Sequence, residues 1–227
     1  MKHVLIVTGG HLNIDFAKAY IKTLSYDKVF AVDKGLEYVD AMDIIPDCLI
    51  GDFDTVDTSL LVTYEERISN GELATCIERY PAMKAKTDTE IALDIAIKEG
   101  ADCITLLAAT GSRMDHMLAN LGLLIKVARF KVKMYIVDET NRVQIMDHDN
   151  FAKCILSKKE QFGKYISLIP ITPCVEGVRC EGALYPLNEE SIYLAESRTV
   201  SNEIEDEYME ITITDGMMLV IESRDKY

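Results

Sequence analysis

Two aspartates follow a short apolar run near the first quarter of the chain, in the stretch LIGDFDTVD. The apolar residues 48–50 predict a buried strand, and Gly51 marks its end. Residues two apart point to the same side of an extended backbone, so Asp52 and Asp54 could present two carboxylates to one place while Phe53 anchors the other face. Such oxygen ligands, combined with substrate phosphates, suit Mg²⁺. The alternative is a polar turn that caps the next helix.

Other acidic residues stand at comparable places. Asp33 directly follows a strand predicted at residues 28–32, where a helix cap is the alternative role. Asp88 opens a helix whose start is marked by a capping box of Thr87 and Glu90. A helix N-terminus attracts anions, and two lysines precede this one. Asp88 therefore either stabilises the helix dipole or acts as a metal ligand or base near a phosphate.

A third group follows the strand predicted at residues 103–109. It consists of Thr110, Arg113, Asp115, His116 and Asn120. The guanidinium of Arg113 offers a fixed fork of donors that suits phosphate oxygens. His116 and Asn120 are four residues apart, so they share one face of the helix predicted from residue 114 to residue 130. A structural role is the alternative for the histidine.

These residues need a scaffold that brings strand ends together. Strands and helices alternate through residues 1–140, which predicts a parallel α/β domain. Residues 141–227 contain short strand-like runs, typical of an all-β sandwich or barrel, and the turn signals between them include Pro173, Gly177 and Gly182. The runs are predicted at 142–146, 151–156, 165–169, 191–195, 209–213 and 217–221. The carboxyl ends of parallel strands lie along one edge of a sheet, where several carboxylates would repel one another unless a cation binds. Mg²⁺ with a polyphosphate fits, so the residues themselves indicate a Mg²⁺- and nucleotide-dependent transferase of unspecified acceptor.

Composition narrows the class of protein further. The net charge of −14 argues against binding nucleic acid, and no apolar run approaches the length of a membrane span. The six cysteines show no CxxC spacing, and several lie within apolar runs. We therefore expect a cytoplasmic protein with reduced cysteines and no cysteine metal site.

Four motifs in order give the chain a resemblance to the thiamine pyrophosphokinase family. They are D-x-G at 33–35, GDFD at 51–54, K-x-x-TD at 84–88 and TG-x-R-x-DH-x-x-x-N at 110–120. The stretches ISLIPITPCVEGVRCEGALYPL and SRTVSNE extend the resemblance into the C-terminal half. It implies transfer of diphosphate from ATP to the hydroxyl of thiamine with release of AMP. It also implies Mg²⁺, a β-sandwich that binds thiamine, and a homodimer with the active site at the subunit interface.

The resemblance also implies roles, residue by residue. The catalytic residues would be Asp52, Asp54, Asp88 and Asp115, of which the first three would hold Mg²⁺. ATP and its phosphates would contact Asp33, Thr87, Thr110, Arg113 and His116, and the acceptor would contact Asn120, Tyr185, Ser201 and Asn202. Several positions depart from the pattern, among them Ala85 in place of a frequent aspartate and Ser112 in place of a frequent glycine. Two alternatives stay open: a diphosphotransferase that acts on another hydroxymethyl heterocycle such as a pterin, and a binding module without turnover.

Overall fold

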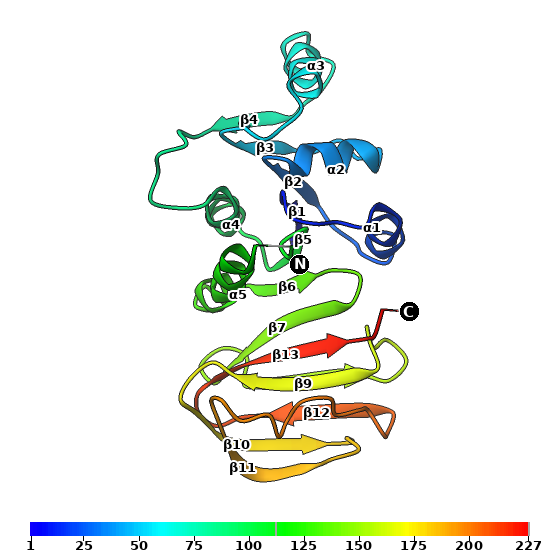
Figure 1. The fold of residues 1–227 in the computed structure, drawn as a ribbon, viewed down its shortest axis with the longest axis vertical. Helices are drawn as coiled ribbons and strands as arrows, with labels where there is room; N and C mark the ends of the chain where they lie inside the picture. Colours follow the sequence, from blue (N-terminus) through cyan, green and yellow to red (C-terminus); the bar gives the residue numbers. More distant parts are fainter. Residues whose placement is uncertain (112, 227) are drawn as a thin grey trace. The chain divides into compact units, whose positions relative to one another are not determined.

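In the computed structural model, which describes residues 1–111 and 113–226, six parallel strands form the sheet of the N-terminal unit (Figure 1). They are β1 (His3–Val7), β2 (Lys28–Val32), β3 (Cys48–Gly51), β4 (Cys76–Arg79), β5 (Cys103–Leu107) and β6 (Lys133–Val137). Their spatial order is β4-β3-β2-β1-β5-β6. The order therefore reverses between β1 and β5, and loops beyond the carboxyl ends of strands at such a reversal are where open α/β sheets bind ligands.

Helices connect these strands. They are α1 (Ile14–Ile21), α2 (Gly35–Ala41), α3 (Thr58–Ser69), α4 (Asp88–Lys98) and α5 (Met114–Ala128). The start of α4 is the predicted one, because the hydroxyl of Thr87 accepts a hydrogen bond from the N–H of Glu90. Buried Ala92, Leu93 and Ala96 provide the apolar face of α4. This cap fixes the position of Asp88, the first residue of α4.

The C-terminal unit contributes antiparallel strands to two sheets. Three of them follow one another in the order β7-β13-β9 in one sheet, and four make up the other in the order β11-β10-β12-β8. The strands are β7 (Asn141–Asp147), β8 (Lys153–Ser157), β9 (Tyr165–Pro170), β10 (Cys174–Glu181), β11 (Leu187–Tyr193), β12 (Tyr208–Thr212) and β13 (Met217–Ser223). Alternate residues of both sheets, among them Leu168, Val178 and Met218, share one buried apolar cluster. The predicted combination of a parallel α/β fold and a β-sandwich is confirmed.

One strand was not predicted. The sequence around β10 contains Pro173, Gly177 and Gly182, which indicated turns. Gly177 has a φ of +60° and lies inside the strand, where the register with β11 shifts between Val175 and Val178. The glycine forms a bulge within a continuous strand, so the expectation of a turn there is wrong.

The chain divides into two compact units. One comprises Met1–Leu123 with Val132–Glu139, and the other comprises Leu124–Lys131 with residues 140–226. Among the helices of residues 1–111 and 113–226, none has the length and apolar character needed to cross a membrane.

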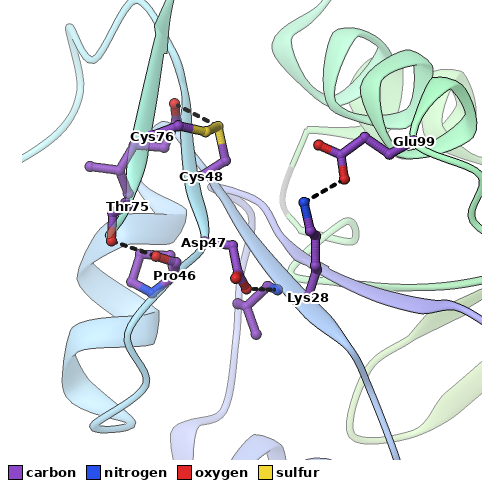
Figure 2. The surroundings of a disulfide bond; sticks show 9 residues. Lys28, Pro46, Asp47, Cys48, Thr75, Cys76 and Glu99 are labelled. Carbon is purple, nitrogen blue, oxygen red and sulfur yellow. Dashed lines mark hydrogen bonds and ion pairs between the residues drawn. A yellow bond between two sulfur atoms is a disulfide. The ribbon is translucent and has the colours of Figure 1, made fainter. Parts of the chain in front are cut away.

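A disulfide joins two neighbouring strands of the N-terminal unit. Cys48 opens β3, Cys76 opens β4, and the two residues are direct register partners with Cα atoms 4.5 Å apart (Figure 2). The expectation that all six cysteines are reduced is therefore wrong for this pair. The pair forms because the sheet order places β3 beside β4, which brings together two cysteines that are 28 residues apart in the chain.

Candidate active site

The carboxylate of Asp33 lies between the loops that follow β2 and β3. Its Oδ1 accepts a hydrogen bond of 3.2 Å from the N–H of Phe53. Gly51 has a φ of +147°, and a Cβ at that position would overlap the same oxygen. The cap of α2 is Lys34, which makes no side-chain capping bond. Asp33 is thus turned toward the GDFD loop, and its alternative role as a helix cap is not observed.

Lys84 lies among the carboxylates. Its Nζ is 2.8 Å from Oδ2 of Asp88 and 3.6 Å from Oδ2 of Asp52. The three side chains are only 12–20% exposed. The structure therefore brings together residues that follow β3, precede α4 and begin α4, with a cation between two anions.

Electrostatic coupling extends this group to Asp33. Burial, with added repulsion from Asp88 and Asp52, raises the pKa of Asp33 to about 6. Burial alone would lower the pKa of Lys84, but its ion pair with Asp88 and the charge of Asp52 raise it above the usual value. We refer to Asp33, Asp52, Asp88 and Lys84 as the acidic cluster. Its carboxylates repel one another, and Lys84 offsets part of that repulsion.

Asp54 contacts this cluster through its backbone N–H, in a different geometry from the one predicted. Phe53 is buried and has a φ of +62°, so the backbone is not extended between Asp52 and Asp54. The N–H of Asp54 donates to Oδ1 of Asp52 at 3.2 Å, and this bond holds the pKa of Asp52 below its usual range. The side chain of Asp54 is exposed, and the cap of α3 is Asp57. The two aspartates are adjacent because of a tight turn.

The donor set of the acidic cluster fits a hard divalent cation. Carboxylate oxygens are the protein ligands that Mg²⁺ prefers. Oδ1 of Asp88 is buried and has no hydrogen-bond partner among the described residues. A buried oxygen of this kind is costly unless something satisfies it. Asp52, Asp54 and Asp88 could therefore hold such an ion.

A cavity of about 450 Å³ opens beside Lys84. It is lined by Tyr80, Lys84, Ala85, Lys86, Ile91, Asp94, Ile95 and Lys98. Ala85, one of the departures from the family pattern, thus contributes apolar surface to this cavity. Ser112, another departure, lies outside the described residues.

The loops after β1 and β5 meet at the reversal of strand order. The hydroxyl of Thr8 donates to the carbonyl of Ala108 at 2.6 Å, and the N–H of Gly10 donates to the same carbonyl at 2.8 Å. The N–H of His11 donates to the carbonyl of Thr110 at 2.9 Å. Hydrogen bonds therefore join the loop after β1 to the loop after β5, and the half-buried Thr110 belongs to the second of these loops.

Arg113 and Asp115 form a two-pronged pair near the start of α5. Nη2 and Nε of Arg113 lie 2.6 and 3.2 Å from the two carboxylate oxygens of Asp115. This contact holds the pKa of Asp115 below its usual range. Both side chains and His116 are exposed, whereas the Nδ2 of Asn120 donates to the carbonyl of Ala109 at 2.8 Å. Asn120 thus anchors the loop after β5 to α5.

Three predicted residues of the C-terminal unit lie together. The N–H of Tyr185 donates to Oδ1 of Asn202 at 3.0 Å, and Nδ2 of Asn202 donates to the carbonyl of Tyr185 at 2.8 Å. The N–H of the adjacent Ser201 donates to the hydroxyl of Ser167 at 3.0 Å. The phenol ring of Tyr185 is 66% exposed, so it is accessible to a ligand.

Lys84 is the residue of the site that the sequence prediction left out. Its charge and its place in the K-x-x-TD motif were the available signals. The motif could not predict that Lys84 also contacts Asp52, because Asp52 follows β3 and lies in a different motif. Arg79 was also missed, and its guanidinium lies 5.0 Å from the ring centre of Phe53.

Comparison with known proteins assigns the chain to a family. Residues 21–136 match the family model described as "Thiamin pyrophosphokinase, catalytic domain", and residues 153–218 match "Thiamin pyrophosphokinase, vitamin B1 binding domain". A thiamine pyrophosphokinase from Bacillus subtilis is 31% identical over 226 residues, covering 99% of this chain and 100% of the relative.

Solved structures agree with this assignment. A crystal structure of the enzyme of that name from Bacillus subtilis has a TM-score of 0.85, 28% identity, and coverage of 99% of this chain and 100% of the other. The thiamin pyrophosphokinase of Geobacillus thermodenitrificans has a TM-score of 0.81 with 28% identity, covering 99% and 98%. The chain belongs to the thiamine pyrophosphokinase family.

Proposed function

We propose that this chain is a thiamine diphosphokinase, which transfers the diphosphate group of ATP to the hydroxyl of thiamine and releases AMP. The observation that carries the proposal is the acidic cluster, formed at the ends of β2 and β3 and the start of α4, in a chain that belongs to this family. Attack by the hydroxyl oxygen on the β-phosphorus forms the new P–O bond and breaks the bond between the α,β-bridging oxygen and that phosphorus.

The acidic cluster is the proposed place of the reacting phosphates. Asp52, Asp54 and Asp88 would hold Mg²⁺, which when bound neutralises charge on the polyphosphate. Lys84, already within 2.8 Å of Asp88, can exchange a carboxylate partner for a phosphate oxygen, since its ammonium has three donors. One carboxylate among Asp52, Asp54, Asp88 and Asp115 accepts the proton of the thiamine hydroxyl.

The rest of the nucleotide would lie along the loops of the strand-order reversal. Arg113 uses two donors on Asp115 and has further donors for phosphate oxygens. Thr110 lies in the connection between β5 and α5, and His116 lies in the first turn of α5. Asp33 and Thr87 complete the proposed ATP side, at the end of β2 and at the start of α4.

The thiamine side is proposed from the C-terminal unit. The exposed ring of Tyr185 can stack on a cationic heterocycle, and Ser201 and Asn202 offer polar groups beside it. Asn120 is proposed to shape the acceptor pocket.

Two copies of the chain are proposed to assemble so that one subunit's C-terminal unit meets the other's acidic cluster. Exposed apolar residues of the C-terminal unit, including Leu184, Leu194 and Val200, support burial of a surface there. We also propose that the enzyme works in the cytoplasm.

The experiment is an assay of nucleotide products from ATP and Mg²⁺, with and without thiamine. AMP that depends on thiamine supports the proposal, because it requires attack at the β-phosphorus. ADP would show transfer of the γ-phosphoryl group and would overturn it. AMP that depends on a pterin alcohol but not on thiamine would show that the pterin alcohol is the acceptor. Ligand binding without any product would favour a binding module.

A further inference from the structure

The Cys48–Cys76 disulfide joins a buried residue to an exposed one. Cys48 is 2% exposed, whereas Cys76, on the edge strand β4, is an exposed residue. The four other cysteines lie outside this bond, and three of them are buried. We therefore expect a reagent dissolved in water to reach Cys76 before Cys48.

Besides the disulfide, β4 is held by its pairing with β3, by the ion pair of Arg79 with Glu65 and by contacts at its two ends. β4 is the edge strand of its sheet and pairs through four register positions with β3 alone. None of its four residues is buried. Two contacts at its entrance do not involve the disulfide. The hydroxyl of Thr75 donates to the carbonyl of Pro46 at 2.6 Å (Figure 2), and the N–H of Cys76 donates to the carbonyl of Asp47 at 2.8 Å. Opening the disulfide should thus loosen β4 without unfolding the sheet.

The exit of β4 leads directly into the acidic cluster. Arg79, its last residue, stacks on Phe53, the residue between Asp52 and Asp54. The next N–H, of Tyr80, donates to the carbonyl of Gly51 at 3.1 Å. The loop of residues 80–87 follows, and its Lys84 lies close to Asp52 and Asp88. The position of this loop therefore depends on how firmly β4 is attached to β3.

We propose that Cys48 and Cys76 form a reversible redox site whose state sets how firmly β4 holds Arg79 and Lys84 against the acidic cluster. The partner chemistry is a thiol reductant of low molecular weight or a protein dithiol, with the corresponding disulfide as oxidant. In the closed state the loop is held for ATP binding, and in the open state affinity for ATP falls. The effect on ATP rests on the proposed function, whereas the redox site itself does not.

The chemical step is thiol–disulfide exchange. A thiolate of the reductant attacks the sulfur of Cys76 and forms a mixed disulfide, while the bond to Cys48 breaks and the sulfur of Cys48 takes up a proton. A second thiol of the reductant then attacks the reductant's sulfur in the mixed disulfide, forms the reductant's disulfide and releases Cys76 as a thiol. The protein gains two electrons and two protons, and the reductant becomes a disulfide.

The first measurement concerns the bond and needs no substrate. The full chain is incubated with oxidised glutathione or with dithiothreitol, alkylated, and digested without reduction. The proposal expects a peptide pair linked through Cys48 and Cys76 after oxidation, and two additional alkylated thiols at these positions after reduction. Absence of the linked pair after oxidation would overturn it.

The second measurement concerns the coupling. Amide hydrogen exchange of residues 76–87 should become about tenfold faster after reduction, while exchange in β1 stays unchanged. The Kd for ATP with Mg²⁺, measured by calorimetry, should rise about threefold or more. Unchanged exchange, or unchanged ATP affinity despite faster exchange, would overturn the coupling. Both readouts are independent of turnover, so failure of the thiamine reaction is distinguishable from failure of this proposal.

Two variants complete the test. Cys76→Ser removes an exposed sulfur and should show the open-state exchange and affinity in either buffer. Cys174→Ser, which changes a half-buried thiol of β10, should respond to redox buffer as the parent does. If Cys174→Ser abolished the response, the redox site would lie elsewhere and the assignment would be overturned.

Discussion

Lys84 and Asp88 form an ion pair of 2.8 Å at the start of α4, with side chains only 12% and 13% exposed. The pair places a cation among carboxylates that burial and mutual repulsion would otherwise keep apart.

Lys84→Met should destabilise the protein in the absence of divalent cations. The carboxylates of Asp52 and Asp88 would lose their partner while still partly buried, which should cost about 1–2 kcal/mol in the free energy of unfolding. Urea unfolding at neutral pH measures this change. Lys86→Met is the matched control, because Lys86 is 51% exposed and pairs with Asp94 at the surface. Equal effects of the two variants would contradict the special position of Lys84.

Asp33→Asn should raise stability at high pH. The pKa of Asp33 rises from 3.8 to about 6 on folding, so its contribution is fully present below 3.8 and is lost as the pH rises through 6. Asparagine stays neutral and tolerates the φ of +46° at this position. After allowance for solvent screening, we expect a gain of about 1 kcal/mol at about pH 8 and little change at about pH 4.

The control for this experiment is Asp43→Asn. Asp43 also has a positive φ, of +60°, but its side chain is 91% exposed. It should therefore show no comparable pH-dependent gain. Saturating Mg²⁺ should reduce the advantage of Asp33→Asn, because a cation offsets the same repulsion. A variant that loses stability at high pH would show that ionised Asp33 is stabilised by its surroundings.

Asp54→Asn should leave the fold intact and remove thiamine-dependent AMP release. The side chain is exposed, so the thermal midpoint should change little, whereas loss of a proposed metal ligand should lower kcat/KM by about 10³-fold or more. Asp57→Asn is the control, since asparagine caps a helix as well as aspartate does and Asp57 caps α3. Near-normal turnover by Asp54→Asn would remove Asp54 from the catalytic group.

Thr87→Ala should affect both stability and activity. Loss of the hydroxyl that accepts from Glu90 N–H should cost about 1 kcal/mol and let the first turn of α4, with Asp88, fray. Asp57→Ala removes the equivalent cap of α3 and should lower stability without the same loss of AMP release. AMP release by Thr87→Ala and Asp57→Ala is compared under conditions in which equal fractions of the two variants are folded. A difference in activity then reports the position of Asp88 and not the loss of stability.

The sequence by itself determined the pattern of elements and where their polar ends fall. Apolar runs and caps are local signals, so the strands that end before Asp33 and Asp52, and the helix that Thr87 begins, were predictable. The family motifs then named a set of residues in chain order. β10 escaped because the bulge at Gly177 has the same local signature as a turn.

The tertiary structure alone decided which distant residues meet. Strand order placed Lys84 against Asp52 as well as Asp88, and paired Cys48 with Cys76 across β3 and β4. The left-handed backbone at Phe53, which brings Asp52 and Asp54 together by a turn, depends on Asp33 accepting its N–H. Local periodicity carries no information about such contacts, because their free energy arises only when separate segments of the chain are folded against one another.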